Sequence, residues 1–326
     1  MRVLVTGGAG YIGSETVRLL AARGHTPVVL DTLERGHRLS VDDAPLIVGS
    51  VSDTALVEAT LRDHAIEAVI HFAALKSVEA SVLDPAGYFE ANVSGTFALL
   101  GAMGRVGVDR LVYSSSCAVY GTPSDLPVRE TSELRPENPY GETKLLVERA
   151  LNWFDTIGLR SIRLRYFNAA GASVDGRHGE DWTDAPNLIP VVIKAALGLG
   201  PAVRILGSDY PTADGTAVRD YVHVADLAEA HLQAVEALAG GLPSATLNLG
   251  TGEGSSVRQV IDAVGAMSGR PVPEEAAPRR VGDPAAVWAD AGLAEATLGW
   301  RAEYRLGTIV ETAWRWHSTH PDGYVR

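Results

Sequence analysis

The sequence predicts an α/β protein in which a parallel sheet is covered by helices on both faces and a smaller α+β lobe follows. Short apolar runs alternate with helical patterns of about 10 to 15 residues up to about residue 167, which is typical of right-handed βαβ units. A glycine cluster directly follows the first apolar run. At 326 residues the chain is longer than one hydrophobic core usually fills, so we expect two lobes. These observations predict a doubly wound, Rossmann-type first domain.

Strands in the first domain are expected at residues 2–6, 27–30, 45–48, 68–73, 110–114 and 161–166. Helical periods lie between them, at residues 12–23, 54–63, 86–105 and 142–157. The strands are rich in Val, Ile and Leu without regular polar alternation, as in sheets that are buried on both faces. We therefore assign residues 1–167 to this domain.

The texture of the sequence changes after residue 167. Residues 168–184 are polar and rich in glycine, which predicts a surface or cleft loop. Further on we expect a helix at 187–199, a strand at 220–224, a helix at 226–238 and a strand at 246–250. Residues 168–326 form the expected second lobe, with segments near 222–250 free to return to the first domain.

Composition narrows the class of partner. The formal net charge of −12 disfavours nucleic acid or an anionic membrane surface, because both bind clustered Lys and Arg. The single cysteine, Cys117, excludes an intramolecular disulfide and a thiolate metal cluster. The nine histidines show no spacing typical of a metal site, so we expect no metal. No signal peptide or membrane-length apolar stretch is visible, and the expected location is cytoplasmic.

The glycine cluster has the spacing of a dinucleotide-binding loop. Gly7, Gly10 and Gly13 lie between the first strand and the first helix. Such glycines allow a tight turn, close approach of a pyrophosphate and close helix–strand packing, while the helix N-terminus offers free N–H groups. Asp31 follows Gly13 by 18 residues, at the end of the second strand. A carboxylate there accepts the ribose hydroxyls of NAD and repels the 2′-phosphate of NADP.

A tyrosine and a lysine are candidate catalytic residues for acid–base chemistry. Tyr140 and Lys144 are four residues apart, on one face of the helix that starts near Pro139. The ammonium group can lower the pKa of the phenol and so make it usable as a base. Ser114 to Ser116 close a strand, where doubly wound folds place active residues. The alternative is an amphipathic helix with a solvated lysine.

Longer stretches resemble a known family. They are TGGAGYIGS at 6–14, HFAALKSVEASVLDPAGYFEANVSGT at 71–96, SSSCAVYG at 114–121, NPYGETK at 138–144, LRYFNAAGA at 164–172, GSDYPTADGTAVRDYVHVADLA at 207–228 and WRWHSTHPDGY at 314–324. On these residues the chain resembles the extended short-chain dehydrogenases/reductases and, among them, the UDP-galactose 4-epimerases, over nearly its whole length. The block at 207–228 is much more specific to these epimerases than the cofactor motifs are.

The resemblance implies NAD-dependent, reversible inversion of C4 in a UDP-hexose. Tyr140 would be the acid/base, Lys144 would hold the nicotinamide ribose and tune Tyr140, and Ser116 would bind the sugar O4. The C4 hydroxyl gives its proton to Tyr140 while hydride passes from C4 to NAD; the 4-keto sugar then turns over and takes the hydride back on its other face. NAD is thus recycled. The family also implies a homodimer.

The resemblance carries two sets of binding residues. The cofactor set comprises Gly7, Gly10, Tyr11, Ile12, Gly13, Asp31, Ser50, Val51, Phe72, Ala73, Ala74, Lys76, Asn92, Ser114, Tyr140, Lys144 and Phe167. The substrate set comprises Lys76, Ser116, Tyr140, Asn168, Asn187, Leu188, Val203, Ile205, Arg219, Tyr221, Arg280, Asp283 and Val287. Arg219 and Arg280 are also what a diphosphate needs chemically, since guanidinium groups are planar and permanently charged. The alternative for each is a surface salt bridge.

Some positions depart from the family pattern. Ser50 stands where the family usually has an Asp for the adenine amino group, and Leu206, two residues after Arg204, where it commonly has a Phe near the uracil. Cys117 replaces a small Ala, and we interpret it as a packing residue. Val287 replaces a bulkier residue beside the sugar pocket, which predicts that UDP-GlcNAc and UDP-GalNAc are accepted besides UDP-glucose and UDP-galactose.

Three other functions remain open. A nucleotide-sugar 4,6-dehydratase shares the fold, NAD and the Tyr–Lys pair, but it needs an extra acid where this chain has Ser116 and Cys117. A UDP-pentose or UDP-glucuronate epimerase is less consistent with the C-terminal motifs than a hexose epimerase. A non-enzymatic NAD-sensing protein would need none of Ser116, Tyr140 and Lys144.

Overall fold

The computed structural model describes residues 1–183, 187–280 and 282–324. Its main sheet is parallel and contains, from edge to edge, β11 (Ala245–Leu249), β6 (Arg160–Tyr166), β5 (Arg110–Ser116), β4 (Ala68–His71), β1 (Arg2–Thr6), β2 (Thr26–Asp31) and β3 (Leu46–Val48). All strands expected up to residue 167 are present, and the doubly wound fold is confirmed.

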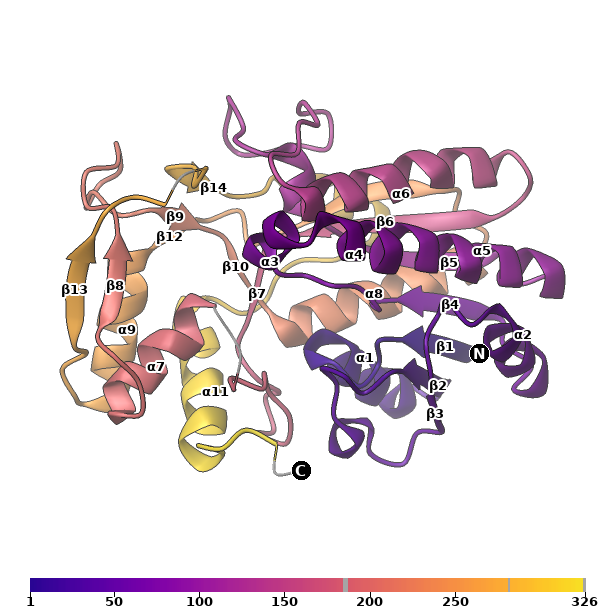
Figure 1. Ribbon diagram of the computed structural model, residues 1–326, viewed down its shortest axis with the longest axis horizontal. Coiled ribbons are helices and arrows are strands. Elements are labelled where there is room, and N and C mark those ends of the chain that lie inside the picture. Colours follow the sequence, from indigo (N-terminus) through magenta and orange to yellow (C-terminus); the bar gives the residue numbers. More distant parts are fainter. Residues whose placement is uncertain (184–186, 281, 325–326) are drawn as a thin grey trace.

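Helices cover both faces of this sheet (Figure 1). On one face lie α1 (Tyr11–Ala22) and α8 (Val224–Ala239), and on the other α2 (Thr54–Asp63), α5 (Gly95–Val106) and α6 (Pro139–Asp155). Successive residues of β1 point into different cores: Val3 and Val5 into one cluster and Leu4 into the second. This double burial explains why the strands read as continuous apolar runs.

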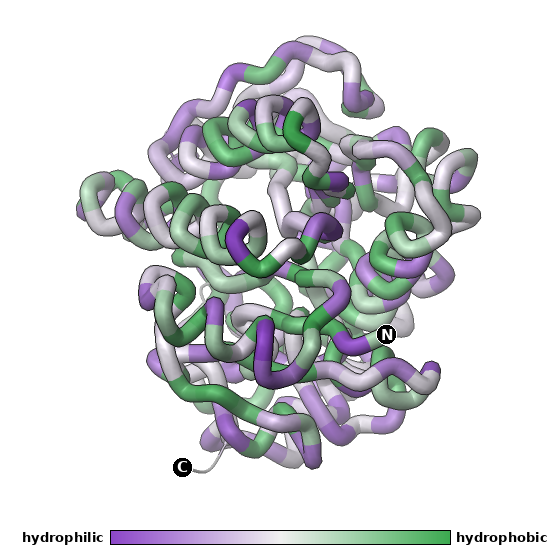
Figure 2. The backbone as a smooth tube through the Cα atoms, turned by 90° about the vertical axis from the view of Figure 1, so that its right-hand side faces the viewer, coloured by the Kyte–Doolittle hydropathy of each residue, from purple (hydrophilic) through white to green (hydrophobic). Residues whose placement is uncertain are grey.

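Short helices complete the first domain. They are η1 (Arg38–Val41), α3 (Val78–Leu83), α4 (Pro85–Phe89), η2 (Glu90–Ser94) and η3 (Cys117–Tyr120). Along the tube in Figure 2, apolar and polar positions alternate within the helices, as expected of helices with one buried face. No helix in the described part of the chain is long and apolar enough to span a membrane.

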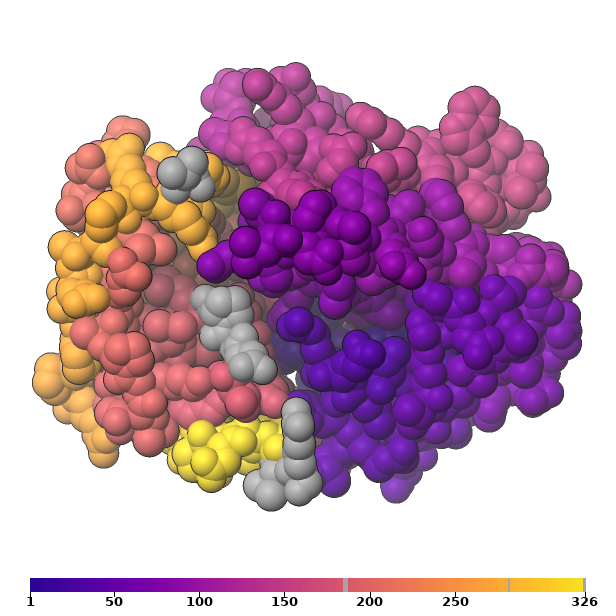
Figure 3. Space-filling model, in the orientation of Figure 1, coloured from indigo at the N-terminus to yellow at the C-terminus, as the bar shows by residue number. Residues whose placement is uncertain are grey.

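The second lobe is built from small sheets and three longer helices. Its elements are β7 (Asn168–Ala170), α7 (Leu188–Leu197), β8 (Val203–Leu206), β9 (Val218–Arg219), β10 (Tyr221–His223), β12 (Ser255–Ser256), α9 (Val257–Ser268), β13 (Glu274–Ala277), β14 (Ala286–Val287) and α11 (Leu306–Thr319). The helix α10 (Gly292–Leu298) packs instead on α8 and β11, against the core of the main sheet. Helices α7, α9 and α11 pack on one another around a third apolar cluster. Figure 3 shows this lobe, salmon to yellow, beside the indigo-to-magenta first domain.

Chain segments after residue 167 contribute to both lobes. The late strand β11 pairs with β6 along the whole of β11, from Ala245 opposite Ile162 to Leu249 opposite Tyr166. Helix α8 packs on α1 and on strands β5 and β6. The chain therefore returns to the main sheet before it completes the second lobe.

Three expected elements differ in the structure. The helix expected at 86–105 is divided into α4, the π-helical η2 and α5. The expected loop at 168–184, whose last residue lies outside the described ranges, contains β7, which pairs with β10. The strand expected at 220–224 is shorter and spans Tyr221–His223. Asp220, just before it, is buried, and its carboxylate accepts hydrogen bonds from the backbone N–H groups of Thr251, at 2.9 Å, and Ala289, at 3.1 Å.

Candidate active site

The glycine loop joins β1 to α1 at the carboxyl end of the sheet. Gly7 has φ of +71°, and a Cβ there would lie 2.6 Å from the backbone nitrogen of Ala73. A Cβ at Gly13 would lie 2.3 Å from the carbonyl oxygen of Gly7. Gly10 is followed by the first turn of α1, which has no side-chain cap. The loop therefore offers uncapped N–H groups and the positive end of α1, which fits a dinucleotide pyrophosphate.

The Asp31 carboxylate lies beside this loop. One of its oxygens accepts a hydrogen bond from the backbone N–H of Ala9 at 3.0 Å, and the other from that of Leu33 at 2.9 Å. The residue is buried at the carboxyl end of β2. A carboxylate held in this place fits the ribose hydroxyls of NAD.

Asn92 organises the segment that follows β4. Its side-chain oxygen accepts from the N–H of Leu75 at 2.8 Å, and its amide nitrogen donates to the carbonyl of Leu75 at 3.0 Å and to the Thr143 hydroxyl at 3.1 Å. Asn92 belongs to η2, and π-helical turns often mark functional sites. Its amide thus ties the segment with Phe72, Ala73 and Ala74 to α6.

The rest of the predicted cofactor set is spread around the same edge. Phe167 and Val51 are buried, Ile12 is half-buried, and Ser50 is exposed with its hydroxyl accepting from the N–H of Ser52 at 3.1 Å. The Tyr11 hydroxyl donates to the carbonyl of Gly171 at 2.6 Å and so links α1 to the second lobe.

The three predicted catalytic residues come together where β5 ends. Asn138 caps α6 by accepting from the N–H of Gly141 at 2.9 Å, and Pro139 occupies the first turn. This start places Tyr140 in the first turn of α6 and Lys144 one turn later. Tyr140 faces Ser116 closely enough for the serine hydroxyl to affect its pKa. The ammonium group of Lys144 donates to the carbonyl of Ser114 at 2.8 Å.

Burial dominates the electrostatics of this group. It raises the pKa of Tyr140 to about 12, partly offset by the Ser116 hydroxyl. It also lowers the pKa of Lys144 to about 8, against the opposing charge of Glu148. In this structure the net pKa of Tyr140 is therefore raised, whereas the sequence predicted a lowered one. Desolvation of the phenol is the largest cause. The ammonium group of Lys144 lies 5.9 Å from the centre of the phenol ring.

Two arginines of the substrate set converge on one carboxylate. Arg219 lies 3.3 Å from Asp283 and Arg280 lies 3.1 Å from it. Arg219 is largely buried, whereas the Arg280 side chain is exposed. The structure therefore gathers these three residues, and a diphosphate bound here would have to compete with Asp283 for the two guanidinium groups.

Glu180, which the sequence did not single out, gathers two other predicted residues. The Asn187 side chain donates to Glu180 at 2.6 Å, and the ammonium group of Lys76 lies 3.4 Å from the same oxygen. Glu180 is buried. Asn168, in β7, is exposed. Lys76 is 104 positions from Glu180 in the chain and Asn187 only seven, so no single local pattern marks this carboxylate.

Strand alternation places neighbouring residues of β8 on opposite faces. Val203 and Ile205 of β8 are buried in the third cluster, whereas the side chains of Arg204 and Leu206 lie on the other face. The side chains of Val203 and Ile205 thus pack inside the second lobe. Leu188, in the first turn of α7, packs against the same cluster.

Val287 and Tyr221 lie close to the cluster of charged residues. Val287, in β14, pairs with Arg219 of β9. Tyr221 is one residue beyond Asp220, and burial raises the pKa of its phenol to about 12. Both side chains are buried.

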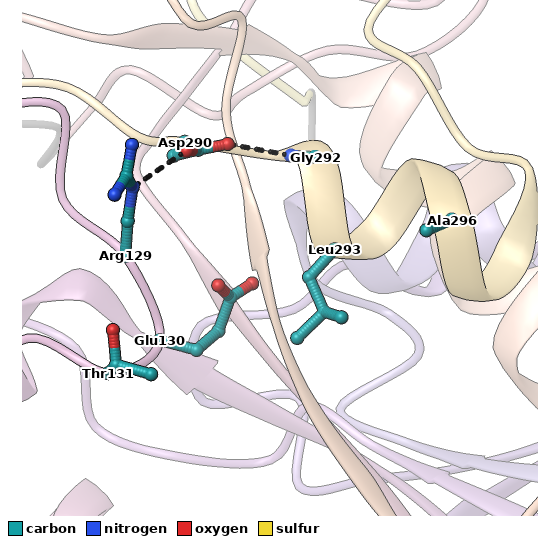
Figure 4. Close-up of a pocket in the computed structure, with 7 residues that line it drawn as sticks. All are labelled: Arg129, Glu130, Thr131, Asp290, Gly292, Leu293 and Ala296. Atoms are coloured by element: carbon teal, nitrogen blue, oxygen red, sulfur yellow. Dashed lines mark hydrogen bonds and ion pairs between the residues drawn. The ribbon is translucent and has the colours of Figure 1, made fainter.

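A hollow lined by other residues lies between the segment at 129–131 and α10 (Figure 4). It measures about 390 Å³. Arg129 binds Asp290 at 3.0 Å, and Asp290 accepts from the N–H of Gly292 at 2.9 Å. Within the described ranges, no three His, Cys, Asp or Glu residues are placed to hold a metal.

The fold, the glycine loop and the group of Ser116, Tyr140 and Lys144 agree with a comparison of the chain with known families. Residues 3–250 match the model of the NAD dependent epimerase/dehydratase family. This match covers well over half of the chain. The chain belongs to this family.

Similar proteins and structures cover the chain from end to end. The UDP-glucose 4-epimerase of Halalkalibacterium halodurans is 47% identical, over 99% of this chain and 98% of the relative. The crystal structure of the Brucella ovis UDP-glucose 4-epimerase in complex with NAD is 45% identical with a TM-score of 0.95, over 100% of this chain and 99% of that one. The Bifidobacterium longum UDP-glucose 4-epimerase, in complex with NAD+ and UDP, is 38% identical with a TM-score of 0.92, over 99% and 100%.

Proposed function

We propose that this protein is an NAD-dependent epimerase that interconverts UDP-galactose and UDP-glucose, a step of galactose metabolism. The observation that carries the proposal is the meeting of Ser116, Tyr140 and Lys144 at the carboxyl end of β5, beside the glycine loop. This set suits reversible oxidation of a sugar carbinol. The full-length similarity to UDP-glucose 4-epimerases supports C4 of a UDP-hexose as the reacting centre.

The residues of the chain divide the work. Bound NAD would supply the acceptor and donor for the C4 hydride. Tyr140 takes the proton from the C4 hydroxyl and returns it after the sugar has turned, and Ser116 holds the same oxygen. Lys144 carries the positive charge that stabilises the phenolate of Tyr140. Arg219 and Arg280 hold the diphosphate while the sugar turns.

The test is direct detection of the C4 epimer by NMR after incubation of the purified protein with UDP-galactose. The wild type should approach the UDP-glucose equilibrium, and Tyr140→Phe should lose about a thousandfold in turnover while keeping NAD. Failure of the wild type to convert either sugar would overturn the proposal.

The properties of Cys117 argue against a nucleotide-sugar 4,6-dehydratase. A dehydratase needs an acid beside the catalytic hydroxyl, and burial raises the pKa of the Cys117 thiol to about 12. A thiol with so high a pKa is too weak an acid to protonate a leaving hydroxyl group, so Cys117 does not supply the missing acid. We expect no 4-keto-6-deoxy sugar to accumulate in the same NMR experiment.

We also propose that the sugar pocket admits N-acetylhexosamines, because Val287 is small. Val287→Tyr should reduce turnover of UDP-GalNAc at least tenfold and leave that of UDP-galactose within about threefold, as a bulky phenol excludes only the larger group. The conservative variant Val287→Ile serves as the matched control for a change of core packing. Absence of UDP-GalNAc turnover in the wild type would contradict this specificity.

A homodimer is the third part of the proposal. Large apolar side chains are exposed on α5 and on α6 and its end: Phe97 is 40% exposed, Trp153 76% and Ile157 79%. Such surfaces often mark protein–protein contacts. Sedimentation should show a dimer that Trp153→Glu dissociates, whereas Leu199→Glu, at a similarly exposed site on the second lobe, leaves it intact. A monomeric wild type would contradict the assembly.

A further inference from the structure

Helix α6 contacts all three serines that end β5. Tyr140 faces Ser116, and Lys144 donates to the carbonyl of Ser114. One turn beyond Lys144, Glu148 accepts a hydrogen bond from the Ser115 hydroxyl at 2.5 Å. Tyr140, Lys144 and Glu148 are spaced four residues apart and so lie on the same side of the helix. Glu148 is thus the third contact of a row whose first two members are the proposed acid/base and its ammonium partner.

Glu148 is held by a buried arginine. Arg165 approaches both carboxylate oxygens, with Nε at 3.0 and 3.2 Å and Nη2 at 2.5 Å from its nearer oxygen. Each of the two side chains is only 5% exposed. Arg165 lies in β6 directly opposite Ser115 in β5, and its remaining nitrogen donates to the Tyr120 hydroxyl at 2.8 Å. The carboxylate of Glu148 is therefore held by two side chains from the sheet, Arg165 of β6 and Ser115 of β5.

Glu148 is also the negative group that acts on Lys144. The lysine nitrogen lies 5.0 Å from the ring centre of Tyr113 in β5 and 5.9 Å from that of Tyr140. Burial and the positive charge of Lys144 together lower the pKa of His71, in β4, to about 3. His71 is therefore neutral. Glu148 raises the pKa of Lys144 against burial. On β6, Arg163 and Arg165 are the cations that face Glu148.

We infer that Glu148, clamped by Arg165 and Ser115, is a positioning residue for the epimerisation. It fixes the helix that carries Tyr140 and Lys144 against the strand end that carries Ser116. Its negative charge lies one helical turn from Lys144, where it favours the protonated ammonium form. The expected effect of Glu148 on turnover rests on the proposed function. Its expected effect on the protonation of Lys144 does not depend on any activity.

The effect of Glu148 on the pKa of Lys144 can be measured directly, because the chain has three lysines to distinguish, Lys76, Lys144 and Lys194. Their side-chain carbons can be followed by NMR through a pH titration of the NAD-bound protein, with Lys76→Arg and Lys194→Arg for assignment. The pKa of Lys144 should drop by at least about half a unit in Glu148→Gln and stay within about 0.3 units in Glu148→Asp, which keeps the charge. An unchanged pKa of Lys144 in Glu148→Gln would overturn the inference.

Loss of Glu148 leaves Arg165 buried and unpaired, which could prevent folding. The double variant Glu148→Gln/Arg165→Met removes both charges and keeps the volume, so it serves as the second variant. Its Lys144 pKa should also be lower than in the wild type. Asn152→Ala is the matched control: Asn152 accepts from Arg163 at 2.8 Å one turn further along α6, and its loss should leave the titration unchanged. A wild-type Lys144 pKa in the folded double variant would also contradict the inference.

The kinetic part is measured at about pH 6.5, where Lys144 is protonated in the wild type. Glu148→Gln should lose at least about tenfold in kcat while KM for UDP-galactose stays within about threefold, because helix placement affects the reaction more than binding. On the alkaline side, kcat of Glu148→Gln should fall at lower pH than in the wild type. Wild-type kcat in Glu148→Gln would refute the positioning role alone, whereas an inactive wild type would refute the proposed epimerase instead.

Discussion

Asp31 is held in place by its own chain, since both carboxylate oxygens accept backbone hydrogen bonds, from Ala9 and Leu33. The side chain is thereby presented to the cofactor in one orientation. Placement by backbone groups costs less ordering on binding than placement by a mobile side chain.

Asp31→Asn should weaken NAD binding about tenfold or more, because hydrogen bonds to a charged acceptor are worth about 1.5–3 kcal/mol. It should also reduce the preference for NAD over NADP, since the repulsion of the 2′-phosphate is lost. Calorimetry of the protein stripped of NAD measures both affinities, with Asp63→Asn, at an exposed carboxylate at the end of α2, as control. Equal NAD affinity in Asp31→Asn and the wild type would contradict the assignment.

Residues in local motifs were predictable, and those defined by distant partners were not. Ser116, Tyr140 and Lys144 stand in short patterns that the sequence shows directly. Glu148 lies next to the same motif, yet its partners Ser115 and Arg165 are joined to it only through the pairing of β5 with β6. The pKa of Tyr140 was predicted in the wrong direction because a sequence does not show how completely the phenol is desolvated.

At the scale of elements, the glycine loop and α1 form the most constrained part of the cofactor site. A Cβ at Gly13 has no room, with Gly7 O at 2.3 Å and the Cα of Gly8 at 2.8 Å. Neither contact is a flexible side chain, so the loop itself would have to move.

Gly13→Ala should therefore abolish NAD binding, whereas Gly104→Ala in α5 should be harmless. At Gly104 a Cβ meets nothing within 4 Å, and alanine should raise the free energy of unfolding by about 0.5–1 kcal/mol through its better helix propensity. NAD content after gel filtration and urea unfolding measure the two effects. Normal NAD content in Gly13→Ala would contradict the role of the loop.

The periodicity of the sequence predicted regular elements and missed their interruptions. Residues 86–105 read as one helix, but Asn92 turns its amide onto Leu75 and Thr143 within the π-helical η2. The two-residue strands β9, β12 and β14 were not predictable either, because they exist only through pairing with one another. Their place in the second lobe depends on contacts between segments far apart in sequence.

At the scale of the molecule, the first domain depends on residues that follow residue 167. Strand β11 covers the edge of β6, and α8 covers α1. A fragment of residues 1–167 would expose this edge and an apolar helix face. We expect the fragment to be insoluble or to fail to hold NAD, as measured by expression and cofactor content; a soluble, NAD-bound fragment would show that the first domain is self-sufficient.

Acid should destabilise the whole molecule through its buried histidines. Burial lowers the pKa of His71 and His317 to about 3 and of His223 and His231 to about 4. Below about pH 6.5 these histidines become protonated in the unfolded chain but stay neutral in the folded one. Each histidine can therefore lower the free energy of unfolding by about 2 kcal/mol at pH 5. Asp226 opposes this, because burial raises its pKa to about 6 and the folded state takes up its proton first.

Urea unfolding at pH 7 and pH 5 measures this loss, and the midpoint should be lower at pH 5. His317 stacks on Trp182 at 4.3 Å between ring centres, and His317→Phe should retain the stacking and reduce the pH dependence. Identical midpoints at the two pH values would mean that the buried histidines do not couple folding to protonation.

The central claim is that C4 is oxidised and reduced again within one active site. It is tested most directly with UDP-galactose that carries deuterium at C4, converted by the NAD-bound protein in ordinary water and examined by NMR. We predict UDP-glucose that retains the deuterium at C4, because the hydride removed from one face of the sugar is returned to the other. Product with hydrogen from water at C4, or no product at all, would contradict the account.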